Sequence, residues 1–177
     1  MIFAAIDPGL DVIAAALFDT SKWEPSHQFD RAAKAYTGYT TWETSATDLL
    51  PTRLHRIFET GELLAKIDHV ELAYVEQPST FGAYGRNRGK GGNVIPQGMA
   101  KFWQALGALL AGLEAAGVRI VMVPAPKIPK PKRHQAVRAV LGKAFGMGPR
   151  GGDRRDVLDA TFLGMWALTE PGLRPRP

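Results

Sequence analysis

Two apolar segments at the start of the chain, separated by a short turn, strongly limit the fold. Met1–Asp7 (MIFAAID) predicts a buried strand that Pro8 and Gly9 terminate, and Val12–Phe18 (VIAAALF) predicts a second strand directly after it. We expect the two strands to form a hairpin, because the connection between them is a tight turn. The first strand then ends with a carboxylate, Asp7, at the turn.

The remaining elements predict an α/β fold in which a mixed central sheet carries the N-terminal antiparallel hairpin and is flanked by helices. Alternating or continuous apolar runs predict strands, and apolar residues at helical spacing predict helices. The predicted strands after the hairpin are Lys34–Thr41, Val70–Glu76 and Val118–Val123. The predicted helices are Leu49–Ile67, Gln97–Ala116, Arg133–Phe145 and Asp153–Leu168. Pro124–Pro131 is too rich in proline for either and predicts an extended connection.

Length and composition predict one domain, residues 1–169, followed by a flexible tail at residues 170–177. The chain has no cysteine, which excludes disulfides and thiolate metal sites. No apolar run reaches the roughly 20 residues that a membrane span requires, and no basic leader precedes the first strand. We therefore expect a cytoplasmic protein without a membrane partner.

Positive charge is concentrated in one part of the chain. Residues 86–155 contain 14 Lys and Arg residues against two acids, a net charge of +12. The rest of the chain contains 8 Lys and Arg residues against 15 acids, a net charge of −7. Such asymmetry indicates a polyanionic partner, although a solvated charged surface is the alternative.

Two carboxylates lie at predicted strand ends, and each has two interpretations. Asp-Pro-Gly is a common turn sequence, so Asp7 is either a turn residue or a metal ligand. Glu76 follows the apolar run LAYV, where an uncompensated charge would be costly. A metal ion, a basic side chain or solvent must therefore offset the charge of Glu76.

Three aspartates recur in the last predicted helix at a spacing that places neighbours on one face. Asp153 follows two glycines and is predicted to be the N-cap. Asp156 lies in the first turn, where the helix dipole favours a negative charge without any metal. Asp159 lies deeper among apolar residues, where a bound cation would explain its presence.

Converging carboxylates of this kind suit metal-dependent phosphodiester hydrolysis. Two Mg²⁺ ions about 4 Å apart can activate the attacking water and stabilise the leaving oxygen. Mg²⁺ prefers hard oxygen ligands and keeps several waters, so three or four carboxylates suffice. The four histidines have no zinc-binding spacing, and His134 is interpreted as a phosphate neighbour or a surface residue.

The motifs IDPG, VEQ and DxxDA, in this order over nearly the whole chain, resemble those of the RuvC-type Holliday junction resolvases. The resemblance implies an RNase H-like fold, a homodimer, and paired nicking of a four-way DNA junction with Mg²⁺ or, as a substitute, Mn²⁺. Asp7, Glu76, Asp156 and Asp159 would then be the catalytic metal ligands. Compact relatives are common in bacteriophages, so a phage origin is a further expectation.

The resemblance also suggests residues that contact DNA. Phe81 matches an aromatic that lies near the opened junction centre, where a base could stack on it, and a loop aromatic folded onto the core is the alternative. The basic segment after the last strand makes Lys132 and Arg133, and more weakly Lys127, candidates for the region of the scissile phosphate. The loop between Phe81 and Pro96 is more basic than we expect of the family, and three of its side chains are predicted to bind DNA: Arg86, Arg88 and Lys90.

Several functional alternatives remain open at this stage. An RNase H-like nuclease of broader branched-DNA or RNA specificity would use the same carboxylates, because readers of shape contact phosphates. A non-catalytic nucleic-acid-binding module of the same fold would have lost one or more carboxylates. An actin-like ATPase needs a second domain, for which 177 residues leave no room. The outer side of Gln97–Ala116 is our expected dimer interface, unless that helix is wholly buried.

Overall fold

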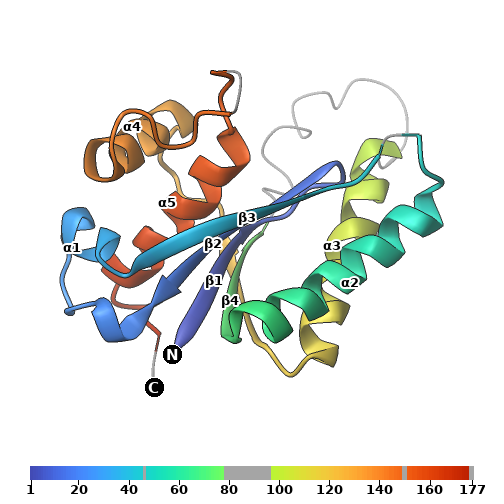
Figure 1. Ribbon diagram of the computed structural model, residues 1–177, viewed down its shortest axis with the longest axis horizontal. Coiled ribbons are helices and arrows are strands. Elements are labelled where there is room, and N and C mark those ends of the chain that lie inside the picture. The colour runs from blue at the N-terminus through green and yellow to red at the C-terminus, as the bar shows by residue number, and fades with distance from the viewer. Residues whose placement is uncertain (46, 78–96, 149–150, 176–177) are drawn as a thin grey trace, which may run out of the picture.

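The centre of the molecule is a five-stranded mixed sheet with the strand order β3-β2-β1-β4-β5 (Figure 1). The computed structural model describes residues 1–45, 47–77, 97–148 and 151–175. β1 (Ile2–Asp7) and β2 (Val12–Asp19) form the predicted antiparallel hairpin, and β3 (Tyr36–Glu43) extends it. β4 (Val70–Gln77) and β5 (Arg119–Pro124) continue the sheet on the other side of β1, parallel to it and to each other. The predicted α/β fold with a mixed sheet is confirmed.

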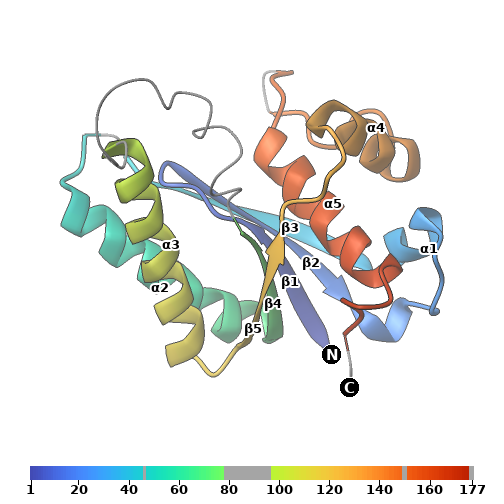
Figure 2. The ribbon, with the colours of Figure 1, turned by 180° about the vertical axis from the view of Figure 1, so that it is seen from behind.

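Helices lie on both faces of this sheet (Figures 1 and 2). α2 (Leu50–Asp68) and α3 (Gln97–Ala115) pack against each other on one face. α5 (Arg155–Thr169) lies across the opposite face and contacts all three central strands. α4 (Lys130–Leu141) and the short α1 (Phe29–Ala33), which follows the single turn η1 (Thr20–Lys22), pack beside α5. Of the helices in the described ranges, none is long and apolar enough to cross a membrane.

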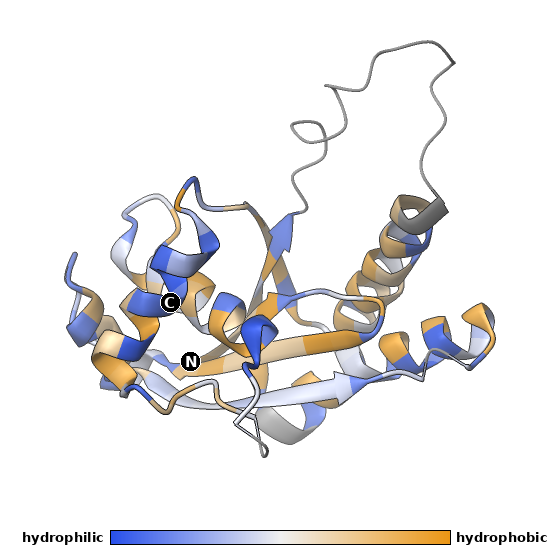
Figure 3. Ribbon diagram, turned by 90° about the horizontal axis from the view of Figure 1, so that it is seen from above, coloured by the Kyte–Doolittle hydropathy of each residue, from blue (hydrophilic) through white to orange (hydrophobic). Residues whose placement is uncertain are grey.

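Strand alternation divides the core into two layers, and Figure 3 shows the hydrophobic residues along the central strands in orange. In β1, Phe3 and Ala5 face α5, whereas Ala4 and Ile6 face α2 and α3. On the α5 side the ring of Phe3 stacks on Phe18 with centroids 5.0 Å apart. Because both faces are covered, the central strands are apolar throughout rather than alternating with polar residues.

The structure corrects two boundaries. Lys34–Thr41 was predicted as a strand, but β3 runs from Tyr36 to Glu43, and Lys34 and Ala35 form the turn that ends α1. The extended connection was predicted to reach Pro131, but α4 begins at Lys130. Pro131 is tolerated there because the amide of a residue in the first turn has no partner within the helix.

The residues after α5, predicted as a flexible tail, contact the body of the protein where they are described. The hydroxyl of Tyr74 donates a hydrogen bond to the carbonyl oxygen of Leu173, and Leu173 packs against the core on the α5 side. The guanidinium of Arg174 lies 6.0 Å from the ring of Trp23.

α2 and α3 approach each other closely at two glycines. A Cβ atom on Gly61 would lie 2.7 Å from the amide nitrogen of Leu113, and one on Gly112 would collide with the carbonyl oxygen of Phe58. Both obstacles are backbone atoms, which cannot move aside as a flexible side chain could. The glycines therefore set the distance between the two helices.

We predict that Gly112→Ala destabilises the protein by about 1–3 kcal/mol, because the helices must separate to admit the methyl group. Gly107→Ala in the same helix is the matched control, since nothing lies within 4 Å of the position of its Cβ. It should stabilise by about 0.5–1 kcal/mol through helix propensity alone. Urea unfolding measures both, and equal effects of the two substitutions would contradict the close approach.

Candidate active site

The first two carboxylates come from neighbouring parallel strands of the sheet. Asp7 ends β1, and Glu76 lies one residue from the end of β4, with Ile6 paired to Val75 just before them. Because side chains alternate along a strand, the side chain of Asp7 lies on the same face of the sheet as Phe3 and Ala5, the face that α5 covers. The side chain of Glu76 lies on this face as well, together with Leu72 and Tyr74. The sheet thus places both carboxylates at one edge, beneath α5.

The third carboxylate, Asp159, projects from the first half of α5. The whole residue is only 1% exposed, and its neighbours Leu158 and Ala160 are fully buried. α5 packs on β1 and β4, which brings Asp159 within electrostatic reach of both Asp7 and Glu76. Three segments far apart in the sequence therefore converge on one site.

Cations from α4 neutralise these carboxylates. The ammonium of Lys130 donates to Oδ2 of Asp159 at 2.6 Å, and Nε2 of His134 lies 3.1 Å from Oδ1 of the same residue. Nη1 of Arg133 lies 3.4 Å from Oε1 of Glu76. Lys130, Arg133 and His134 occupy neighbouring positions of one helix, so a single element supplies all three partners.

Arg133 is buried and its guanidinium is held by backbone acceptors as well. It donates from Nε to the carbonyl oxygen of Ile128 at 2.7 Å and from Nη2 to that of Pro126 at 2.5 Å. The guanidinium also lies 5.9 Å from the ring of Phe162 on α5. Arg133 therefore fixes the connection between β5 and α4 against Glu76.

The electrostatics of the site favour protonated acids when only protein side chains are present. Burial, together with the charges of Glu76 and Asp159, raises the pKa of Asp7 to about 8, against the opposing effect of Lys130. Burial also raises the pKa of Glu76, and Arg133 only partly offsets it. Although burial opposes its charge, the hydrogen bond to Asp159 and the nearby carboxylates raise the pKa of Lys130. The site thus holds more buried acid than its cations neutralise.

Asp156 and Asp153 have different environments. Asp156 is exposed in the first turn of α5, and its charge contributes to raising the pKa of Asp7. The prediction that Asp153 is the N-cap was wrong: Arg154 occupies that position and makes no side-chain cap hydrogen bond. Asp153 instead pairs with Arg138 of α4 and, at 3.8 Å, with Arg155. Two nearby guanidinium groups outcompete the backbone amides for this carboxylate.

The donor chemistry of the carboxylate site (Asp7, Glu76, Asp156 and Asp159) fits a hard divalent cation. All four offer carboxylate oxygens, and a cation would offset the burial and the carboxylate repulsion that raise the pKa of Asp7. Within the described part of the chain, no three His, Asp or Glu side chains already form a group that could hold a metal ion. The ammonium of Lys130 lies on Asp159 instead, so cation binding would require side chains to turn.

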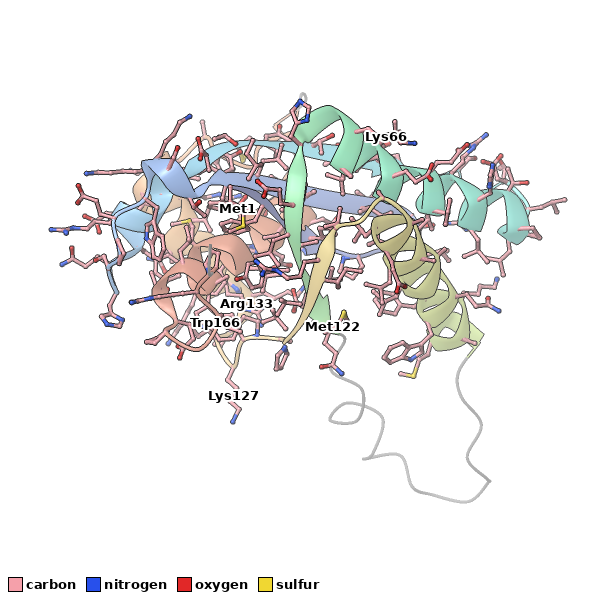
Figure 4. All side chains as sticks on the ribbon, turned by 90° about the horizontal axis from the view of Figure 1, so that it is seen from below. Met1, Lys66, Met122, Lys127, Arg133 and Trp166 are labelled. Carbon is pink, nitrogen blue, oxygen red and sulfur yellow. The ribbon has the colours of Figure 1, made fainter. Side chains whose placement is uncertain are left out.

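The predicted DNA-binding residues fall into three groups. Phe81, Arg86, Arg88 and Lys90 lie outside the described residues. Lys127 and Lys132 are exposed, and Figure 4 shows Lys127 projecting away from the body of the protein. Arg133 lies inside, with its guanidinium occupied by protein acceptors, so its predicted contact with DNA stays a prediction.

Two residues of the site, Lys130 and His134, were not predicted as part of it. His134 was interpreted as a surface residue or phosphate neighbour, but it is 9% exposed and lies against Asp159. Their i, i+4 spacing was a usable signal, because it places both on one helix face. That signal was lost when Lys130 was included in the extended connection.

The fold of the chain is similar to that of solved structures, although its sequence matches no family model and no curated protein. A structure of Thermus thermophilus RuvC in complex with a Holliday junction substrate is similar with a TM-score of 0.64 and 16% identity, covering 98% of this chain and 96% of that one. A second Thermus thermophilus RuvC structure gives a TM-score of 0.61 and 20% identity, covering 94% and 95%. The chain therefore has the RNase H-like α/β fold of these RuvC structures.

We predict that Arg133→Met destabilises the protein by about 3 kcal/mol or more, because it leaves Glu76 without its buried partner. Lys132→Met, one residue away on an exposed side chain, should change stability by no more than about 0.5 kcal/mol. Chemical unfolding at neutral pH measures both. Equal values would show that the contacts of Arg133 do not stabilise the fold.

We also predict that Asp7→Asn stabilises the metal-free protein, increasingly so as the pH rises. Unfolded Asp7 loses its proton near pH 3.8, whereas the folded protein retains it until about pH 8. The folded state binds more protons in this interval, so this residue makes wild type less stable as the pH increases. Melting temperatures in a chelator at pH 5 and pH 8 measure the effect.

The matched control for this prediction is Asp30→Asn, which removes an exposed carboxylate on α1. The gain of Asp7→Asn over wild type should exceed that of the control and should be larger at pH 8. A gain that is the same at both pH values would contradict the buried, repelled state of Asp7.

Proposed function

We propose that this protein is a structure-selective endodeoxyribonuclease that resolves four-way DNA junctions by metal-dependent phosphodiester hydrolysis. The observation that carries the proposal is the convergence of Asp7, Glu76 and Asp159 from three separate segments at one edge of an RNase H-like sheet. A fold maintained for packing alone would gain nothing from placing mutually repelling acids beneath a helix. The four-way junction is proposed by likeness to the RuvC structure that was solved with such a substrate.

The cofactor that we propose is a divalent cation, with Mg²⁺ as the first candidate and Mn²⁺ as its substitute. We propose two such ions, as two-metal phosphodiester hydrolysis requires. Asp7, Glu76, Asp156 and Asp159 would hold them. When bound, such cations activate water and stabilise charge on the phosphate oxygens. The protein's own part is to hold Asp159 rigidly on α5 and to keep Glu76 aligned through Arg133.

The basic residues after β5 would bind the substrate. α4 contains four Lys and Arg residues and no acid, and it lies directly beside the carboxylate site. Exposed Lys127 and Lys132 would contact phosphates. Such contacts are independent of the DNA sequence, and they weaken as the salt concentration rises. The roles predicted for Phe81, Arg86, Arg88 and Lys90 belong to the same proposal. So does the homodimer, because paired nicks in two strands need two symmetrically placed sites. The cytoplasm is the proposed location.

A second candidate function is a DNA-binding module that does not cut. The ion pair between Lys130 and Asp159, at 2.6 Å, favours it, since the ammonium already neutralises a carboxylate that a metal ion would need. A nuclease of broader specificity, for forks or RNA–DNA hybrids, would have the same site and differ in its substrates. One cleavage experiment separates the three.

We predict that wild type makes symmetric nicks in a labelled four-way junction when Mg²⁺ or Mn²⁺ is present. Asp156→Asn should lower the cleavage rate by about 100-fold or more while binding persists, since it removes a ligand but no basic residue. Asp30→Asn, an exposed acid on α1, should cut like wild type. Linear duplex, fork and hybrid substrates are measured in parallel.

The outcomes identify the function. Cutting of the fork or hybrid at the junction's rate would keep the nuclease and reject junction selectivity. Binding without cutting in Mg²⁺ and in Mn²⁺ would favour the non-catalytic module. No interaction with any of the four substrates would reject the proposal as a whole.

A further inference from the structure

A groove of about 690 Å³ runs along α4 toward the start of α5. Five of its lining side chains are basic: Lys130, His134, Arg138, Lys143 and Arg155. These side chains come from α4, from the turn after it and from the first residue of α5. The structure therefore gathers basic residues from two helices around one hollow.

The charge of this groove is only partly compensated. Among its lining residues the one acid is Asp153, which pairs with both Arg138 and Arg155. Arg138 also donates to the carbonyl oxygen of Phe145 at 3.3 Å, which holds it in place against the turn. Arg138 and Arg155 share Asp153, and Lys130 pairs with Asp159, so the four Lys and Arg residues of the groove face two carboxylates. An anionic ligand would supply the missing negative charge.

Two of the lining residues connect the groove to the carboxylate site. Lys130 and His134 line the groove and also contact Asp159. From there Lys130, His134 and Arg138 continue at i, i+4, i+8 along one face of α4, a distance of about 12 Å at 1.5 Å per residue. Phosphates of one DNA strand rise about 3.4 Å per nucleotide along the duplex axis and lie farther apart along the strand itself, so this length accommodates more than one of them.

We propose that the α4 groove binds the sugar–phosphate backbone of the DNA strand that leads away from the phosphate held at the carboxylate site. This inference rests on the proposed function and adds a binding track to it. The contacts are electrostatic and independent of sequence, because Lys and Arg neutralise phosphates without reading bases. A DNA backbone suits the groove better than an acidic protein segment does, since two of its lining residues, Lys130 and His134, also contact Asp159 of the site proposed to cut DNA.

The test neutralises two exposed groove residues, Lys143 and Arg155, that form no ion pair with Asp7, Glu76, Asp156 or Asp159. In the double variant Lys143→Ala with Arg155→Ala, Asp153 keeps Arg138 as its partner, so the fold should persist. The matched control is Lys22→Ala with Arg31→Ala, which also removes one lysine and one arginine. Both control residues lie away from Asp7. Lys22 contacts Asp19, the last residue of β2, which is paired with Ile2 at the opposite end of β1 from Asp7. Arg31 lies on α1. Binding of a four-way junction and of linear duplex is measured in a chelator at several salt concentrations.

We expect the groove variant to bind both DNA forms about tenfold or more weakly near physiological salt, and to lower the slope of log K against log salt by about two. The control should leave the slope unchanged. A third variant, Gln135→Glu, adds a negative charge to the groove without removing a contact, and should weaken binding relative to Gln135→Ala.

The results separate this inference from the proposed function. If wild type binds DNA and the groove variants bind it equally well with the same slope, the groove is not the track, and the proposed function stands. Weakening by the control pair to the same extent would also overturn the inference. Failure of wild type to bind either DNA form would overturn both. Cleavage is not needed for any of these readings.

Discussion

The structure depends on the neutralisation of carboxylates that are buried between the sheet and α5. Asp159 is 1% exposed and Asp7 is largely shielded from water, so each charge needs a partner or a proton. α4 supplies the partners through Lys130, His134 and Arg133, and this requirement explains why a helix without acids packs at this edge of the sheet. Burial and the charges of Glu76 and Asp159 nevertheless raise the pKa of Asp7, against the opposing effect of Lys130. A site with an excess of buried acid has an affinity for cations built into it, and the proposed function uses that excess.

The same helix connects two parts of the proposed activity. Lys130 and His134 contact Asp159 and also line the groove that contains Arg138, and Arg133 contacts Glu76. Arg133 anchors α4 to the carbonyl oxygens of Pro126 and Ile128, so the segment between β5 and α4 cannot shift without disturbing Glu76. On the opposite side of the hairpin, buried Arg53 of α2 donates to the carbonyl oxygen of Leu10 at 3.0 Å and pairs with Asp11. The turn after Asp7 is thereby held from the other face of the sheet.

The features that followed from the sequence are those set by local periodicity. The hairpin, the parallel strand ending at Glu76 and the apolar last helix were predicted because alternation and helical spacing are visible over single segments. The parts that were missed depend on contacts between distant residues. His134 contacts Asp159, 25 positions away, and Asp153 prefers Arg138 to a capping role. The i, i+4 spacing of Lys130 and His134 marks a shared helix face but does not identify Asp159 as their partner, and the sequence around Asp153 does not identify Arg138. The start of α4 was missed because proline was interpreted as excluding a helix, although it is tolerated in the first turn.

The most direct test of this account is a crystal structure of the protein soaked in Mn²⁺, with the ion located by its anomalous scattering. The account predicts Mn²⁺ bound by oxygens of Asp7 and Asp159, with the ammonium of Lys130 displaced from the 2.6 Å contact that it makes with Asp159. Mn²⁺ bound elsewhere, or absent while Lys130 stays on Asp159, would contradict a cation site at these carboxylates. In that case the buried acids would be structural partners of α4, and the protein would be a DNA-binding module that does not cut.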